Sequence, residues 1–317
     1  MSATRVSRRE LLSMSGALGV ASVAGARPAA GSAGAERPLV RFGLVADVHY
    51  ADRDPDPNLW GEGSRRFYRE ARRRLEEAVG QFNAHGMDFA IELGDIKDMG
   101  KDKAATVAAL AEIERTFAGF RGPRYHVCGN HDFDCLTEAE FFSSVQNDGR
   151  PMERGHYAFS ARGVRFVVLD ACYDSSFRHY SRNNPWEDAN VPPDQLAWLK
   201  DELKRASAPV VAFCHQRLDP SAESRHLVRN AGKVRAILEA SGKVRTVFTG
   251  HQHNGGIGEC NGIDYYSLRA MACRGEKGAN SYAEVSVFGD GTVSVLGYRR
   301  AVSFVSRGIC PQTGSRA

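Results

Sequence analysis

Five short polar clusters in this 317-residue chain carry the side chains best suited to chemistry, and each follows an apolar run. They supply Asp, His and Asn side chains, in the order Asp47-Val48-His49, Gly94-Asp95-Ile96-Lys97-Asp98, Gly129-Asn130-His131-Asp132, His215 and Gly250-His251-Gln252-His253. Mixed imidazole and carboxylate ligands suit Zn, Fe, Mn or Ni better than Ca or Mg. Two such cations about 3.5–4 Å apart lower the pKa of a bridging water and clamp a phosphoryl group. The clusters therefore predict a dinuclear site that hydrolyses phosphoester bonds by attack of a bridging hydroxide.

The segments before these clusters are apolar and rich in β-branched residues, which predicts buried strands. These strands are expected over Leu39 to Ala46, Asp88 to Leu93, Arg124 to Cys128, Pro209 to His215 and Val244 to Gly250. Apolar residues at helical spacing predict helices over Gly63 to His85, Ala104 to Ala118 and Pro193 to Ala206. Hairpins are expected over His156 to Asp170, Ile257 to Leu268 and Tyr282 to Tyr298.

The alternation of strands and helices favours an α/β fold, with two packed sheets in one domain and helices outside. Ligand sites in such folds collect beyond the carboxyl ends of the strands. Because all five clusters stand at such ends, they are expected to converge on one crevice. Each residue alone has an ordinary structural explanation, such as a turn at Gly94-Asp95 or a helix cap at Asp47. Those explanations must all hold at once to account for five clusters.

The ordered set D-x-H, G-D-x-x-D, G-N-H-D, H and G-H-x-H resembles the calcineurin-like metallophosphoesterases. The resemblance implies a four-layer α/β (α+β) sandwich, in which two mixed β-sheets are flanked by helices. It also implies a ligand set for each metal. The first metal takes Asp47, His49 and His253, the second takes Asn130, His215 and His251, and Asp95 bridges them.

The same resemblance implies two catalytic residues beside the metals. His131 is expected to contact the phosphate and to protonate the leaving oxygen, and Asp98 to orient His131. The other five histidines are expected to be structural, and they are His85, His126, His156, His179 and His226.

Segments outside the metal clusters resemble the manganese-dependent ADP-ribose/CDP-alcohol diphosphatases, over about residues 40 to 300. The similar segments are Gly43 to Asp52, Arg65 to Arg69 and Gly250 to Gly256. That group has Gln where this chain has His49 and Glu where it has Asp132, which leaves the substrate open.

The resemblance implies hydrolysis of phosphodiester or diphosphate bonds in nucleoside-diphosphate-linked small molecules. A broad, alkaline phosphatase-like phosphomonoesterase of the same family is the alternative, and cyclic-nucleotide phosphodiesterase activity also remains open. A non-catalytic metal-binding scaffold is an alternative of another class.

Two arginines are candidates to bind a second phosphate of the substrate. Arg65 and Arg69 are four residues apart on the predicted helix and would share one face of it. Arg72, Arg73 and Arg74 follow, so a solvated basic face is the alternative. The long insertion around residues 183–190 is expected to cap the site. Five aromatic residues are candidates to stack on a nucleobase of the substrate. These are Tyr50, Phe177, Tyr180, Trp186 and Tyr266.

Residues 1–36 are expected to lie outside the fold. Arg8-Arg9, an apolar run over Leu11 to Ala26 and the small residues Ala24-Gly25-Ala26 resemble a twin-arginine export signal. A disordered basic tail is the alternative. The resemblance implies the twin-arginine export machinery as a partner and a periplasmic or extracellular location. The run is too short and Gly-rich for a permanent membrane span.

The net charge and the cysteine pattern argue against two further possibilities, a nucleic-acid partner and a thiolate zinc site. The formal net charge of +4 is too small to argue for nucleic acid as a partner. The chain has seven cysteines and no C-x-x-C pair, so a thiolate zinc site is not expected. Cys128 and Cys214 are expected to be buried, and a disulfide among Cys260, Cys273 and Cys310 is open. The phosphoesterase domain is expected over 37–305, with a tail over 306–317.

Overall fold

The computed structural model describes residues 37–55, 65–182, 185–207, 209–275 and 278–306. The predicted export signal, almost all of the predicted tail and Cys310 lie outside these ranges, so they stay predictions. None of the helices within the described ranges has the length and apolar character needed to cross a membrane.

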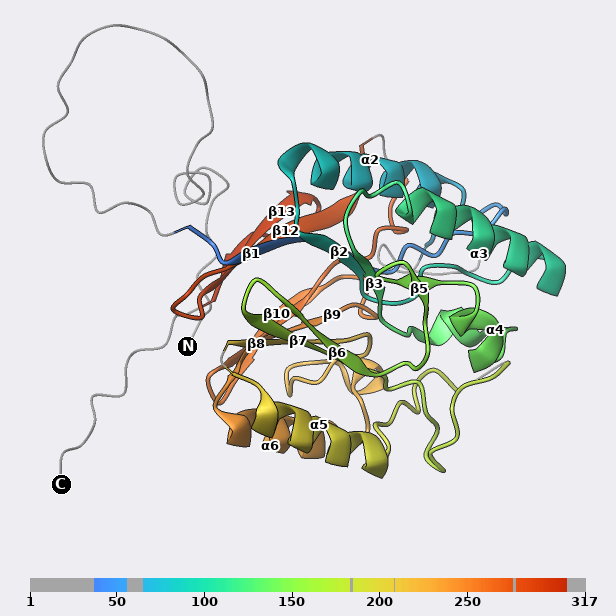
Figure 1. Cartoon of the computed structure of the whole chain (residues 1–317). Coiled ribbons are helices and arrows are strands. Elements are labelled where there is room, and N and C mark those ends of the chain that lie inside the picture. Colours follow the sequence, from blue (N-terminus) through green and yellow to red (C-terminus); the bar gives the residue numbers. More distant parts are fainter. Residues whose placement is uncertain (1–36, 56–64, 183–184, 208, 276–277, 307–317) are drawn as a thin grey trace, which may run out of the picture.

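Two six-stranded mixed sheets form the centre of the molecule (Figure 1). The first runs in the order β14 (Phe304–Val305), β13 (Val293–Arg299), β12 (Ser281–Val287), β1 (Val40–Val45), β2 (Phe89–Glu92) and β3 (Arg124–His126). The second runs in the order β10 (Gly256–Cys260), β11 (Ile263–Ser267), β9 (Val244–Thr249), β8 (Val210–Cys214), β7 (Val164–Leu169) and β6 (Tyr157–Ala161). Strands β1, β2 and β3 are parallel to one another, as are β7, β8, β9 and β11. A small separate hairpin joins β4 (Gln146–Asn147) to β5 (Arg150–Pro151).

Helices cover the outer face of each sheet, which gives the predicted four layers (Figure 1). Helices α2 (Glu70–His85) and α3 (Lys103–Phe117) lie on the first sheet, and α5 (Pro193–Arg205) and α6 (Ala231–Ser241) lie on the second. A short helix α4 (Glu138–Phe142) and two 3₁₀ turns, η1 (Asn130–Phe133) and η2 (Ser224–His226), complete the described elements.

The alternation of side chains along each strand explains why both sheet faces are apolar. In β7, Phe166 and Val168 pack between the two sheets, whereas Val167 and Leu169 pack under α5 and α6. Successive side chains of a strand point to opposite faces, so a strand between two layers must be apolar throughout. This confirms the interpretation of the continuous apolar runs as buried strands.

The start of α2 differs from the prediction. The helix was expected from Gly63 but begins at Glu70. Before it, Arg66 forms an antiparallel bridge with Cys273, and the Phe67 amide donates to the Ala272 carbonyl at 2.9 Å. This pairing holds residues 66–67 extended, so the predicted helical face shared by Arg65 and Arg69 is wrong.

The cysteines follow the prediction where the structure describes them. Cys128 and Cys214 are buried, as expected. Among the described cysteines, no disulfide joins Cys260 to Cys273.

Candidate metal centre

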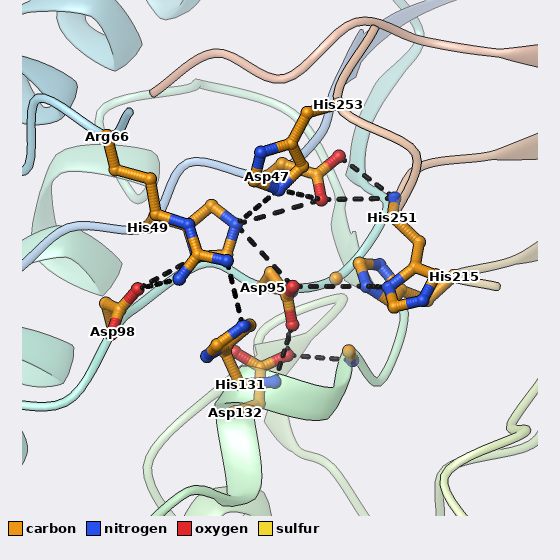
Figure 2. A network of polar contacts seen from close by, with 12 residues as sticks. Asp47, His49, Arg66, Asp95, Asp98, His131, Asp132, His215, His251 and His253 are labelled. Atoms are coloured by element: carbon orange, nitrogen blue, oxygen red, sulfur yellow. Dashed lines mark hydrogen bonds and ion pairs between the residues drawn. The ribbon is translucent and has the colours of Figure 1, made fainter. Parts of the chain in front are cut away.

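Side chains of the five polar clusters lie together in one network (Figure 2), and each cluster follows the end of a strand. The loops after β1, β2 and β3 contribute from the first sheet, and those after β8 and β9 contribute from the second. Seven side chains predicted as ligands lie here, and they are Asp47, His49, Asp95, Asn130, His215, His251 and His253. All but His253 are buried, so their polar atoms face one another rather than solvent.

Asp47, His49 and His253 form the first ligand group. Their ligand atoms lie within 4.8 Å of one another. The Nε2 atoms of His49 and His253 are 3.1 Å apart, and the His253 Nε2 is 3.6 Å from an oxygen of Asp47. Three donor atoms converging in this way match the ligand set that the sequence predicted for the first metal.

Asp95, His215 and His251 form the second ligand group, with ligand atoms again within 4.8 Å. The Nε2 of His215 is 3.2 Å from Asp95 Oδ2 and 3.2 Å from His251 Nδ1. The Nδ1–H of His215 donates to the Leu93 carbonyl at 2.7 Å, which leaves Nε2 as the ligand atom.

Two buried polar atoms at this second group have no hydrogen-bond partner among the described residues: Asn130 Oδ1 and His251 Nε2. Buried polar atoms nearly always have a partner, so such a pair calls for an explanation. Both residues line the same cavity as Asp95. A cation coordinated by the Asn130 amide oxygen and a His251 imidazole nitrogen would satisfy both atoms.

Asp95 connects the two groups. Its Oδ2 is 3.2 Å from His215 Nε2 and 3.6 Å from His49 Nε2, so one carboxylate reaches both sets of ligands. Its Oδ1 accepts from the His131 amide at 2.7 Å, which fixes the orientation of the carboxylate. This is the placement expected of a bridging ligand.

The backbone at the ligands is strained in a way that aims them at one point. Asp47, His49, Asp95 and His251 all have φ between 48° and 62°. This left-handed region is uncommon for residues other than glycine, and such strain clusters at functional sites. A side chain at Gly94 is excluded as well, because its Cβ would lie 2.6 Å from His215 Nδ1.

Electrostatics at the site favour positive charge between the groups. Burial raises the pKa of Asp47 to about 7, and the neighbouring Asp95 adds to the rise. Burial lowers the pKa of His49 to about 3, which keeps this imidazole in the neutral form that binds metals. Although burial opposes it, Asp95 raises the pKa of His215 to about 10. These shifts favour a positive charge beside Asp95, which suits a metal ion there.

His131 lies next to the ligands, but its partner differs from the prediction. Its Nδ1–H donates to Asp134 Oδ2 at 2.7 Å, and its Nε2 accepts from Arg66 Nη2 at 3.0 Å. Asp98, predicted to orient His131, instead accepts from Arg66 Nη1 at 2.6 Å and lies 3.3 Å from His49 Nδ1. The hydrogen bond to His131 therefore comes from Asp134, whereas Asp98 lies within 4.8 Å of it and bonds to Arg66.

The charges around His131 suit a proton donor. Burial and Arg66 oppose its protonation, but Asp95, Asp134 and Asp98 together raise its pKa above the ordinary value. Burial raises the pKa of Asp98, yet His131 and Arg66 outweigh it and hold that pKa well below its usual range. Asp98 is therefore an anion that anchors the Arg66 guanidinium.

Asp132 has a positioning role that the sequence did not reveal. Its carboxylate accepts from the amides of Asp95 at 3.0 Å, Ile96 at 3.1 Å and Gly129 at 2.9 Å. These bonds tie the loop after β2 to the loop after β3. The only sequence signal was that the similar diphosphatases carry the longer Glu at this position.

A cavity of about 510 Å³ opens beside the ligands. Its wall includes Arg66 and His131, together with Trp186, Arg225 and His226. His226 was expected to be structural, so its place here was missed.

Neither predicted substrate arginine lines this cavity. Arg65 is exposed and lies over the Phe67 ring, and Arg69 is exposed and pairs with Asp52 and Asp54. Arg66, between them, is the arginine that enters the site. A substrate role for Arg65 and Arg69 stays a prediction without a contact to support it.

Comparison with known proteins agrees with this geometry. The profile of the family described as calcineurin-like phosphoesterase matches residues 40–255. A manganese-dependent ADP-ribose/CDP-alcohol diphosphatase from Oryza sativa subsp. japonica is 32% identical, covering 81% of this chain and 91% of its own. One from Arabidopsis thaliana is 31% identical, covering 85% and 97%.

A solved structure shows the same fold. A dimetal phosphatase from Danio rerio superposes with a TM-score of 0.76 at 23% identity, covering 86% of this chain and all of that one. The buried Asp and His groups, the family match and these relatives agree with one another. The chain belongs to the calcineurin-like phosphoesterase family, as a dimetal phosphoesterase related to the manganese-dependent ADP-ribose/CDP-alcohol diphosphatases.

Proposed function

We propose that this phosphoesterase cleaves the diphosphate bond of small molecules linked to a nucleoside diphosphate. The observation that carries the proposal is the cavity of about 510 Å³ beside the two ligand groups. This volume lies within the range of about 300–1,000 Å³ typical of pockets for drug-sized ligands. A phosphate ester of a small alcohol fills little of it, whereas a nucleoside diphosphate derivative fills much more. The names of the rice and Arabidopsis relatives specify substrates of this class.

The metal pair is proposed to include Mn²⁺, since both of these relatives are named as manganese-dependent. His49 adds an imidazole where that group has Gln, so Fe, Zn and Ni remain candidates. Asp47, His49 and His253 would hold one ion, and Asn130, His215 and His251 the other, with Asp95 between them. Bound there, two cations would neutralise phosphoryl charge and lower the pKa of a bound water.

Arg66 and His131 are proposed to act in sequence on the substrate. In the structure the Arg66 guanidinium donates a hydrogen bond to His131 Nε2, and His131 Nδ1–H donates to Asp134. An anionic phosphoryl oxygen in the cavity competes for the N–H groups of Arg66, because guanidinium prefers charged acceptors. Withdrawal of Arg66 frees Nε2 to take up a proton from solvent, and the resulting imidazolium then donates that proton to the leaving oxygen.

A panel of substrates and metals tests the proposal. CDP-choline, ADP-ribose, bis-p-nitrophenyl phosphate and p-nitrophenyl phosphate are assayed with Mn²⁺, Zn²⁺, Fe²⁺ or Ni²⁺, alongside metal analysis of the protein. The two diphosphates are expected to have the highest kcat/KM. Preference for p-nitrophenyl phosphate would instead favour the phosphomonoesterase, and a metal-loaded protein inactive on all four would favour the scaffold.

We also propose that residues 1–36 direct export by the twin-arginine machinery, on the strength of Arg8-Arg9 and the apolar run that follows. Replacing both arginines by lysine is expected to retain the protein in the cytoplasm of a bacterial host. Cell fractionation measures this, and unchanged export would refute the route.

A further inference from the structure

Three residues form a wall of the cavity that the metal chemistry does not use. They are Trp186, from the insertion before α5, and Arg225 and His226, from η2, and we call them the aromatic wall. The Arg225 guanidinium lies 4.7 Å from the centre of the Trp186 ring. Arg225 also pairs with Glu187 at 3.0 Å, which ties the two segments together. Segments about 40 residues apart thus build one surface.

The aromatic wall stands directly beside the second ligand group. The ring centres of Trp186 and His226 lie 5.5 Å and 5.2 Å from that of His251. A phosphoryl group held at His251 would therefore place its nearest substituent against the indole and imidazole rings. Arg66 and His131 line another part of the same cavity, around Asp98 and His49 (Figure 2).

The chemistry of the wall selects a planar, uncharged group over a second phosphate. Its one cation, Arg225, is already paired with Glu187, and Glu223 also lines this part of the cavity. Indole and guanidinium faces bind the π-faces of nucleobases, and each stacked base contributes about 1–3 kcal/mol. An anionic group finds a better partner in Arg66, whose N–H groups face His131.

We infer that the aromatic wall of Trp186, Arg225 and His226 is the subsite for the nucleobase of the substrate. The inference rests on the proposed function, since it assumes a nucleoside diphosphate derivative in the cavity. It assigns the nucleotide half to the His251 side of the metal centre and the remaining half to the Arg66 side.

Kinetics with a base-free substrate test the inference. CDP-choline is compared with P1,P2-dimethyl diphosphate, which keeps the diphosphate and lacks the base. Trp186→Ala is expected to lower the ratio of their kcat/KM values by about 5- to 140-fold, which corresponds to ~1–3 kcal/mol. Trp186→Phe should recover much of the ratio. Arg225→Ala should also lower the ratio, because Arg225 lies against the Trp186 ring. Arg162→Ala, which removes an exposed arginine paired with Asp88, is its matched control and should leave the ratio unchanged.

An equal loss on both substrates, with reduced metal content, would overturn the inference by showing that Trp186 only supports His251. An unchanged ratio would also overturn it while leaving the proposed function intact. If the wild-type protein cleaves neither diphosphate, the proposed function fails, and the subsite is then decided by binding.

Binding is measured through the fluorescence of Trp186. The chain has three tryptophans, so Trp60→Phe with Trp198→Phe leaves Trp186 as the only indole. CMP and AMP are expected to quench its emission on stacking, whereas ribose 5-phosphate, which lacks a base, is not. No quenching by any of the three, or the same response to all, would overturn the inference.

Discussion

The buried ion pair of Arg217 and Asp219 provides a direct test of how the second ligand group is held. Arg217 is 3% exposed and Asp219 1%. The pair is bidentate, with Nε to Oδ1 at 2.9 Å and Nη2 to Oδ2 at 2.7 Å. The remaining Nη1 donates to the Gln252 side-chain oxygen at 2.8 Å. Because Gln252 stands between His251 and His253, Arg217 anchors the loop that serves both metals.

Arg217→Met keeps most of the side-chain volume but leaves the Asp219 carboxylate buried and unpaired. Removing one partner of a buried pair costs about 3–5 kcal/mol. Ser221 donates to the same carboxylate, which places the expected loss toward the lower end. The free energy of unfolding is measured by urea titration. Arg73→Met is the matched control, because its pair with Glu70 is exposed, and it should cost less than about 1 kcal/mol.

A double variant separates stability from metal binding. Arg217→Met with Asp219→Leu removes the stranded charge, so it should recover most of the lost stability. It does not restore the anchor on Gln252, so metal affinity should stay below that of the wild type. A double variant as unstable as the single one would refute the charge argument. Unchanged metal affinity in both variants would refute the anchor.

Further predictions concern the catalytic and buried histidines. His131→Ala should lower kcat by about 100- to 10,000-fold with metal content retained, whereas Asp95→Ala should lose metal and activity together, as measured by metal analysis. Asp134→Asn should lower kcat by about 10- to 100-fold, by analogy with carboxylates that orient metal-bound imidazoles. It should also move the alkaline limb of the kcat profile to lower pH, because a carboxylate raises the pKa of His131; an unmoved limb would contradict this role. Although burial opposes it, Glu114 raises the pKa of His126 to about 10, so the stability this adds is complete below about pH 6.5 and is lost as the pH rises toward 10. The unfolding free-energy difference between wild type and His126→Gln should then shrink by at most ~1.4 kcal/mol per pH unit, and a constant difference would show that the pKa is not raised.

The strands and the helices that follow them were largely predictable because their signals are local. Each strand of the sheet centres is a short apolar run that ends at a polar residue, as in Val40–Val45 before Asp47. The helix α6 was missed, and α2 was predicted to start too early. In α2 the error arose because residues 66–67 pair with residues 272–273, about 200 positions away. Pairing over that distance leaves no periodic signal in the segment itself.

The convergence of the predicted ligands was also predictable, because they follow the carboxyl ends of strands, where ligand sites collect in α/β folds. The hydrogen-bond partners around the ligands were not predictable, because they depend on the direction in which each side chain points. Asp98 was the carboxylate expected to orient His131, but the turn of η1 places Asp134, three residues after His131, against Nδ1. Arg66 stands between two candidate arginines, and its extended backbone turns it inward while its neighbours stay exposed.

By itself, the sequence determined the chemistry available to this protein. Asp47, Asp95, Asn130, His215 and His251 stand at the ends of strands in two packed sheets, so their types and order predict two groups of metal ligands, which the structure brings together. The tertiary structure decided which groups surround those sites and what substrate they admit. The aromatic wall and the Arg66–His131 contact join loops whose paths depend on packing across both sheets, and no local pattern encodes such packing.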